Sequence, residues 1–125
     1  MALNQFSRTQ LLLGQESMDL LANATVAVFG IGGVGGYTVE ALARSGVGHF
    51  VLVDDDKVCL TNINRQIIAT RSSVGKYKVD VMKERILDIN PKAEVEQSKD
   101  LNAQLKIALP EGISKADVEI ENDYV

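Results

Sequence analysis

The sequence predicts an α/β fold, a Rossmann-like doubly wound parallel sheet, on three observations. A short apolar run, Thr25–Phe29, is typical of a buried strand and stops at a glycine. A glycine cluster at 30–36 and a helical pattern follow it, and a second apolar run at 50–53 comes next. Strand, glycine turn, helix and strand in this order form a βαβ unit, whose strands are parallel and whose crossover is right-handed.

The remaining elements follow from periodicity and stop signals. The leucine-rich segment 4–21, interrupted by Gly14, predicts a short helical lead-in, and the helix after the glycine cluster is expected over 37–45. Residues 57–73 are polar and predict an irregular connection. The clearest helix is 76–90, which Pro91 ends, and 94–97 predicts a third strand. Residues 97–125 are weakly patterned, with a helix possible at 101–109 and the start of a strand at 123–125.

Size and composition indicate one globular domain over residues 1–125, of ordinary hydrophobic (46%) and charged (24%) content. Three strands and a stub would leave a sheet edge and one face exposed, so we expect the N-terminal part of a longer domain.

No apolar run reaches the roughly 18 residues of a membrane span. A single cysteine, Cys59, excludes an internal disulfide and a cysteine-based zinc site, and a cytoplasmic location is the default.

The formal net charge is −4, and its distribution matters more than its size. Residues 1–91 carry nine Lys/Arg and nine Asp/Glu, so the whole acidic excess lies in 92–125. Neither part has the basic surface with which bulk charge holds a nucleic acid. An RNA partner would therefore need a local patch.

The glycine turn is the first candidate binding element. Gly30, Gly32 and Gly35 match the G-x-G-x-x-G pattern, with Gly33 between them at the expected start of the helix. The turn follows a predicted strand, and Asp54 comes 24 residues after Gly30, at the end of the next strand. The glycines allow a tight turn and close approach of a phosphate to helix N–H groups, and the acid accepts hydrogen bonds from ribose. This context predicts a nucleotide site.

Cationic residues beyond the second strand bear on which nucleotide is bound. Arg65 lies in the segment 62–66, and Arg71, Lys76 and Lys78 follow it. Arginine and lysine suit a triphosphate and the charge that develops on the α-phosphate during adenylyl transfer. An NAD-binding Rossmann domain stays open as an alternative, although it leaves Arg65 and Lys78 without a role.

Four linked motifs carry a resemblance to a known family. They are the glycine turn 30–35, the acidic strand end 53–56, the segment 61–66 and the segment 74–78. Together they resemble the ThiF/MoeB/E1-like superfamily, whose members adenylate a carboxylate with ATP. Similarity over residues 4–96, from Phe6 through 41–48 to 89–91, is closer to the tRNA threonylcarbamoyladenosine dehydratase branch. A sulfur-carrier (ThiS/MoaD-like) adenylyltransferase is the alternative within the superfamily.

The resemblance implies roles for single residues. Asp54 matches the acid that holds the adenosine ribose, and Asp56 beside it is a candidate for orienting a cation or a basic side chain. Arg65 and Lys78 match residues that contact the phosphates and support adenylation. Arg8 matches an arginine that reaches the ATP of the partner subunit in a homodimer. The full set implied for nucleotide binding is Gly30, Gly32, Gly33, Gly35, Asp54, Asp56, Asn62, Arg65, Gln66 and Lys78.

The resemblance also implies ATP and Mg²⁺ as cofactors, tRNA as substrate, ligase-type chemistry and, for some relatives, sulfur-transfer partners. The Mg²⁺-binding Asp of the family is expected beyond residue 125, so no metal ligand is assigned within this sequence. We therefore expect this chain alone to bind ATP weakly or not at all and to be inactive. His49 and Cys59 are interpreted as structural, because no carboxylate or base is near either one in the sequence.

Overall fold

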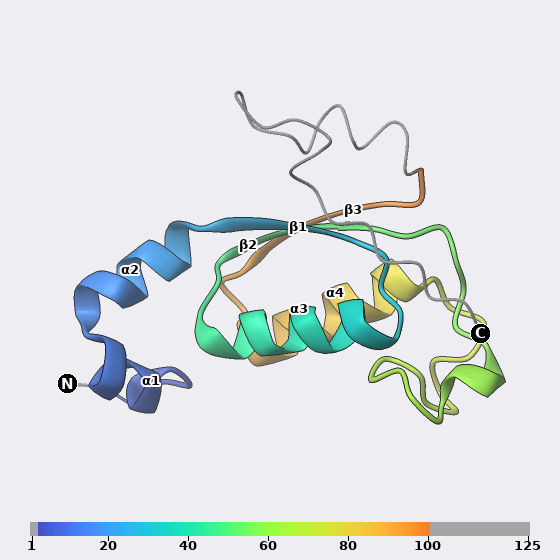
Figure 1. The fold of residues 1–125 in the computed structure, drawn as a ribbon, viewed down its shortest axis with the longest axis horizontal. Coiled ribbons are helices and arrows are strands. Elements are labelled where there is room, and N and C mark those ends of the chain that lie inside the picture. The colour runs from blue at the N-terminus through green and yellow to red at the C-terminus, as the bar shows by residue number, and fades with distance from the viewer. Residues whose placement is uncertain (1–2, 101–125) are drawn as a thin grey trace.

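The computed structural model describes residues 3–100 (Figure 1). The expected helix at 101–109 and strand at 123–125 lie outside the described residues. The elements in chain order are α1 (Ser7–Leu13), α2 (Gln15–Asn23), β1 (Thr25–Phe29), α3 (Gly33–Ser45), β2 (His49–Val53), the 3₁₀ turn η1 (Leu60–Asn62), α4 (Lys78–Ile89) and β3 (Glu94–Ser98).

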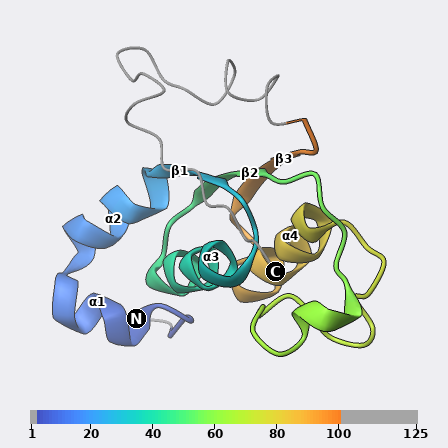
Figure 2. The same cartoon turned by 45° about the vertical axis from the view of Figure 1, so that its right-hand side comes forward.

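The three strands form one parallel sheet in the order β1-β2-β3. Helices α3 and α4 provide the two crossovers and lie side by side beneath the same face of the sheet (Figures 1 and 2). Two successive right-handed crossovers that move in the same direction put their helices on the same face. The predicted Rossmann-like α/β class is confirmed.

The core follows the alternation of side chains along the strands. Phe50 and Leu52 of β2 are buried against α3 and α4, together with Val39, Val79 and Met82 of those helices. The intervening strand residues face the other side of the sheet, where Phe29, Val51 and Val53 form a second, smaller buried cluster. Both faces of this sheet therefore carry apolar side chains, as expected of a parallel sheet.

Helix α3 begins at Gly33, as the glycine-turn pattern indicates, and not at residue 37, where the side-chain pattern alone begins. Glycine has low helix propensity, and propensity alone places the 33–36 segment in a loop. Tertiary packing decides otherwise, because Gly35 and Gly36 are buried and α3 approaches the loop after η1 closely. A Cβ atom on Gly36 would lie 3.3 Å from Cγ2 of Ile67. The glycines thus serve both the turn and the packing of the helix behind it.

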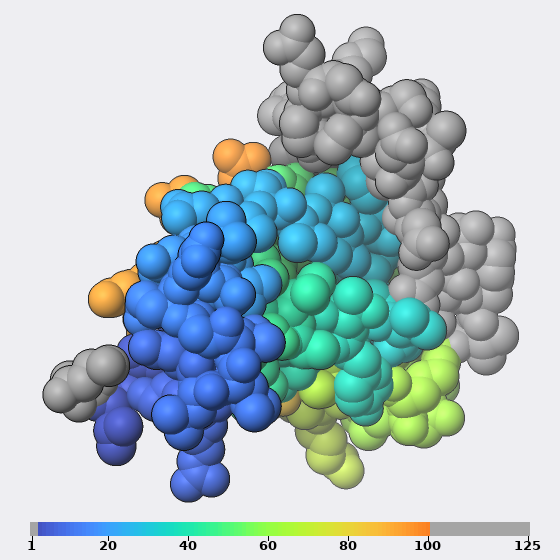
Figure 3. All heavy atoms as spheres, turned by 60° about the vertical axis from the view of Figure 1, so that its left-hand side comes forward, coloured from blue at the N-terminus to red at the C-terminus, as the bar shows by residue number. Residues whose placement is uncertain are grey.

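The lead-in is two helices rather than one. Gly14 has φ of +85° and is both the last cap of α1 and the first cap of α2. The two helices form the blue projection that lies beside β1 and α3 in Figure 3. Backbone N–H groups of Gly48 and His49 donate to the carbonyls of Leu21 and Ala24, which attaches α2 to β2. Among the described residues, no helix combines the length and apolarity required to cross a membrane.

Candidate nucleotide-binding site

The glycine turn lies at the carboxyl ends of β1 and β2, where open α/β sheets bind their ligands. The N–H of Gly30 donates to the carbonyl of Val53 at 2.8 Å, which carries the turn across the end of β2. Gly30 has φ of +98°, a conformation that side chains with a Cβ rarely adopt. The turn then enters α3 through Gly32, which caps the helix without a side chain. The first turn of a helix presents N–H groups that the helix itself does not use.

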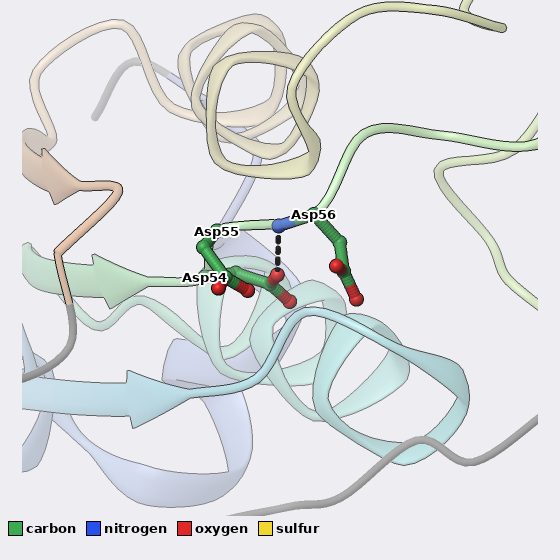
Figure 4. A group of neighbouring side chains, drawn as sticks. All are labelled: Asp54, Asp55 and Asp56. Atoms are coloured by element: carbon green, nitrogen blue, oxygen red, sulfur yellow. Dashed lines mark hydrogen bonds between the residues drawn. The ribbon is translucent and has the colours of Figure 1, made fainter.

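Asp54 ties this turn to the end of β2. One carboxylate oxygen, Oδ2, accepts the N–H of Ile31 at 2.6 Å, and the other, Oδ1, accepts the N–H of Asp56 at 2.8 Å. Figure 4 shows the second of these bonds, with the carboxylates of Asp54 and Asp56 both directed toward the ribbon of the glycine turn. Burial raises the pKa of Asp54 above its ordinary value, although the two N–H groups and the nearby Lys78 oppose this shift. Each carboxylate oxygen has two lone pairs, so these bonds leave acceptor capacity toward a ligand.

Lys78 is brought to the same edge by a short antiparallel bridge between Lys57 and Tyr77. The N–H of Lys78 donates to the carbonyl of Asp56 at 3.0 Å, and its Nζ lies 4.0 Å from Oδ2 of Asp56. The Lys78 side chain is only 5% exposed. Lys78 is also the first residue of α4, so its ammonium stands at a second helix N-terminus. Both features favour a negatively charged ligand at this edge.

One terminal nitrogen of the Arg65 guanidinium is hydrogen-bonded within the loop, and the other has no partner among the described residues. Its Nη1 donates to the carbonyl of Thr61 at 3.1 Å and to Oδ1 of Asn64 at 3.0 Å. Its Nη2 is buried and has no hydrogen-bond partner within residues 3–100. An unpartnered buried donor is costly unless a ligand satisfies it. This atom is the clearest local sign that the loop accommodates an anion.

Asn62 and Gln66, the other two predicted residues of this loop, are both buried. Oδ1 of Asn62 accepts the N–H of Cys59 at 2.8 Å, which closes the η1 turn. The carbonyl of Asn62 accepts the N–H groups of Arg65 and Gln66. Asn62 therefore shapes the loop, and its amide nitrogen is the group with which it would contact a phosphate.

The structure thus brings the glycine turn, Asp54, Asp56 and Lys78 together at one edge. Arg8 is not part of this group. It lies on α1 and is exposed, and α1 occupies the end of the molecule opposite the glycine turn (Figure 1). Within one chain, the helix that carries Arg8 and the glycine turn lie near opposite ends of the strands.

The three consecutive acids Asp54, Asp55 and Asp56 offer carboxylate oxygens within 4.8 Å of one another. Asp55 and Asp56 are exposed. Asp54 already accepts two N–H groups, and Asp56 is near the Lys78 ammonium. Oxygen ligands of this kind suit Mg²⁺, but its octahedral shell needs more oxygens than these acids offer.

Sequence reasoning missed an ion-pair cluster around a buried glutamate, whose two arginine partners are 38% (Arg85) and 60% (Arg44) exposed. Glu40 of α3 is 7% exposed, and its carboxylate accepts a hydrogen bond from Nε of Arg44 at 2.8 Å. Its carboxylate also accepts two hydrogen bonds from Arg85 on α4, from Nε at 2.5 Å and from Nη2 at 3.2 Å. The Glu40–Arg44 spacing of four residues is visible in the sequence as a helical pair. The bond to Arg85 spans 45 residues and has no local signal.

His49 also has a partner that the sequence did not indicate. Its Nδ1 lies 3.1 Å from Oε2 of Glu94, because the two residues are opposite each other in the β2–β3 register. Glu94 is 45 residues away in the sequence, so a search for neighbours along the chain could not find this carboxylate. The pair is at the beginning of the strands, away from the glycine turn, so His49 takes no part in the candidate site. Cys59 is exposed and its Sγ contacts the carbonyl of Lys57.

A parallel sheet with a glycine turn, a strand-end acid and a lysine at the next helix start defines a Rossmann-type nucleotide-binding domain. The model of the ThiF family matches residues 6–118. The chain therefore belongs to the ThiF family.

Relatives and solved structures of this family resemble the chain closely. The tRNA threonylcarbamoyladenosine dehydratase of Bacillus subtilis is 59% identical over 93 residues, which cover 74% of this chain and 37% of that protein. The crystal structure of the Escherichia coli tRNA N6-threonylcarbamoyladenosine dehydratase in complex with ATP superposes with a TM-score of 0.80 at 44% identity. The match covers 85% of this chain and 45% of that one.

A sulfur-carrier enzyme is a more distant relative. The sulfur carrier protein ThiS adenylyltransferase of Escherichia coli is 34% identical over 121 residues, or 94% of this chain and 47% of that protein. The chain thus spans 37% and 47% of the lengths of these two curated relatives.

Proposed function

We propose that the chain forms the nucleotide-binding part of an ATP-dependent, E1-like adenylating enzyme that acts as a tRNA threonylcarbamoyladenosine dehydratase. The observation that carries this proposal is the meeting of the glycine turn, Asp54 and Lys78 at one sheet edge. The Bacillus subtilis and Escherichia coli relatives support the choice of substrate, since both are dehydratases by name and the second is bound to ATP.

Each part of the site has a physical role in this proposal. The N–H groups at the start of α3 bind phosphate oxygens, and Asp54 accepts hydrogen bonds from the ribose hydroxyls. Arg65, with its unpartnered Nη2, and Lys78 neutralise negative charge where it grows during adenylyl transfer. ATP, when bound, supplies the adenylyl group that gives a carboxylate a good leaving group. The Asn62 carbonyl accepts the N–H groups of Arg65 and Gln66 and so fixes the backbone from which Arg65 reaches the phosphates.

Mg²⁺ belongs to the same proposal. Asp56 is the described acid best placed to hold a cation near the phosphates, because its carboxylate is exposed and faces the glycine turn (Figure 4). Its 4.0 Å approach to Lys78 shows that it already attracts a cationic group. The ion would need further oxygen ligands from water, from phosphate or from residues outside this sequence.

A homodimer would complete the site. Arg8 is exposed on α1 and far from the turn in its own chain, so its family role requires a second copy. Helices α1 and α2 also expose large apolar side chains, since Leu11, Leu12 and Leu20 are 85%, 88% and 69% exposed. An apolar surface of this kind is typical of a contact between protein chains. We infer that this surface joins two copies and delivers Arg8.

Three further parts of the proposal rest on other grounds. The tRNA substrate comes from the name of the dehydratases, and sulfur-transfer partner proteins come from the family resemblance. A cytoplasmic location remains the default expectation from the sequence. A ThiS-type adenylyltransferase is the second candidate, because that relative aligns with 94% of the chain. In both cases ATP activates a carboxylate, so the same nucleotide site serves either substrate. NAD binding is disfavoured, because Arg65 and Lys78 would then have no role.

The proposal is tested by following backbone amide signals by NMR during titration with Mg·ATP and, separately, with NAD. NMR suits the weak ATP binding that we expect from this chain alone. ATP should shift the signals of the glycine turn and of Lys78, and NAD should not. Arg65→Ala should reduce the initial slope of the ATP titration roughly tenfold, since it removes a charge-assisted hydrogen bond. Arg71→Ala, an exposed arginine of the same loop, is the matched control and should leave the slope unchanged.

A folded chain whose signals respond to NAD as strongly as to ATP would contradict the proposal, whereas no response to either ligand is the outcome expected if the groups beyond residue 125 are required for binding. Equal loss in Arg65→Ala and Arg71→Ala would contradict the role of Arg65 and indicate general charge attraction. Because this chain alone is expected to be inactive, cyclisation of threonylcarbamoyladenosine in tRNA is assayed with ATP on a chain that also contains the Mg²⁺-binding Asp of the family, and this assay separates the dehydratase from the sulfur-carrier enzyme.

A further inference from the structure

An ion pair joins α3 and α4, and its two residues lie at the same sequence distance from the first residue of their helices. Glu40 comes seven residues after Gly33, the first residue of α3, and Arg85 comes seven residues after Lys78, the first residue of α4. At 1.5 Å per residue, seven residues correspond to roughly 10 Å of helix. The pair therefore connects the two helices at matched depths beneath the edge that carries the candidate site.

We propose that Arg85 and Glu40 are positioning residues that set the axial register of α3 and α4, and thereby the place of Lys78 relative to the glycine turn. The proposal rests on the proposed function, because it assigns a role within that nucleotide site. It adds two residues that do not touch the nucleotide themselves.

The geometry of the pair suits this role. Arg85 presents two nitrogens to the two oxygens of Glu40, with Nε on Oε1 and Nη2 on Oε2. A bidentate arginine–carboxylate pair restricts sliding and rotation together, which a single contact does not. The Glu40 side chain is 9% exposed and the Arg85 side chain is 38% exposed, so the carboxylate depends on its arginine partners more than on water for hydrogen bonds. Apolar contacts alone tolerate small sliding motions between helices more easily than this pair does.

The consequence for the site follows from what each helix start carries. The start of α3 is the glycine turn, and the start of α4 is Lys78, whose backbone is also bound to Asp56. A shift of α4 by a fraction of a turn would move the Lys78 ammonium away from the phosphates that the turn binds. Small displacements of this kind reduce transition-state stabilisation strongly.

A matched control variant is available at Arg44, the second arginine that binds the Glu40 carboxylate. Arg44 donates to Glu40 from the same helix, four residues along, so this bond cannot affect the position of α4. Arg44→Met and Arg85→Met each remove one arginine from the same carboxylate and keep an aliphatic stem. Only Arg85→Met removes the ion pair between α3 and α4, and the apolar packing between the helices is retained in both variants.

The test compares these variants by NMR titration with Mg·ATP, with urea unfolding measured in parallel to confirm that each variant is folded. We expect Arg85→Met to lower the initial titration slope roughly three- to tenfold and Arg44→Met to leave it unchanged. Arg85→Lys should recover part of the loss, since an ammonium replaces one of the two hydrogen bonds. In the Lys78→Gln background, the effect of Arg85→Met should disappear, because the residue to be positioned has lost its charge.

Equal losses in Arg44→Met and Arg85→Met, or an undiminished loss in the Lys78→Gln background, would overturn the positioning role. If the wild-type chain is folded but does not bind ATP, the titration gives no slopes to compare, and NAD binding in place of ATP would contradict the proposed function instead. The register itself then remains measurable without ligand. Arg85→Met must shift the amide signals of Gly33 and Lys78 where Arg44→Met does not, and absence of that difference would also overturn the inference.

Discussion

Oδ2 of Asp54 accepts a hydrogen bond from the backbone N–H of Ile31 at 2.6 Å. This bond joins the acid at the end of β2 to the glycine turn at the end of β1. Oδ1 of the same carboxylate accepts the N–H of Asp56, so Asp54 organises both connections that leave the sheet at this edge. Asp54 therefore has a structural role in the shape of the turn, which exists before any ribose is bound.

The first prediction concerns this bond. Asp54→Asn replaces one acceptor oxygen by an NH₂ group, which would face an N–H donor. We expect a loss of about 1–3 kcal/mol in the free energy of unfolding, because a buried donor loses its charged acceptor. Urea unfolding measures this loss, and the amide signal of Ile31 should shift. Asp55→Asn, at the exposed neighbouring acid, is the control and should change neither quantity. Equal stability of Asp54→Asn and the wild type would contradict the structural role.

The second prediction concerns the pH dependence that Glu40 contributes. Burial alone would raise the pKa of Glu40, but hydrogen bonds and charges from Arg85 and Arg44 outweigh it and hold the pKa below its ordinary value of 4.5. The other titratable groups near this cluster are Asp88 and Tyr37, which act on Arg85. The ionised form is the one that the fold favours. Its contribution is thus complete above pH 4.5 and is lost as the pH falls through the folded-state pKa.

Unfolding of the wild type and of Glu40→Gln should therefore be compared across pH. The stability difference should be constant near neutrality and shrink as the pH falls below 4.5. A difference measurement is required, because Asp54 contributes the opposite slope. Burial raises the pKa of Asp54, so its part of the stability falls as the pH rises from the unfolded-state value of 3.8 through the folded-state pKa. A pH-independent difference would show that the charge of Glu40 is not the stabilising feature.

The third prediction concerns the apolar surface of α1 and α2. If this surface joins two copies, sedimentation should give twice the chain mass, and Leu11→Gln with Leu12→Gln should give the monomer. The free energy of unfolding of the monomer should be unchanged, because the two side chains are 85% and 88% exposed within one chain. Leu60→Gln, at another exposed leucine outside α1 and α2, is the matched control and should remain dimeric. A wild-type chain that is monomeric at every concentration would contradict the proposed dimer.

The local chemistry of the site was predictable from the sequence, and its boundaries were less so. The turn 30–35 and Asp54 could be recognised because a glycine turn between a strand and a helix has a fixed length and a fixed position relative to the next strand end. The side-chain pattern placed the start of α3 too late because glycine propensity favours a loop, whereas the close approach of Ile67 to Gly36 favours a residue without a Cβ within the helix. The break at Gly14 was visible as an interruption, but not as two separate helices.

The class of fold, the glycine turn with its acid, and the family all follow from the order of residues, because each depends on groups that are close together along the chain. Which distant residues meet became known only from the folded arrangement. Folding puts Arg85 on Glu40, Glu94 beside His49 and Lys78 beside Asp56, and it separates Arg8 from the turn. Such contacts depend on helix packing and strand register over tens of residues. No local preference of the chain encodes them.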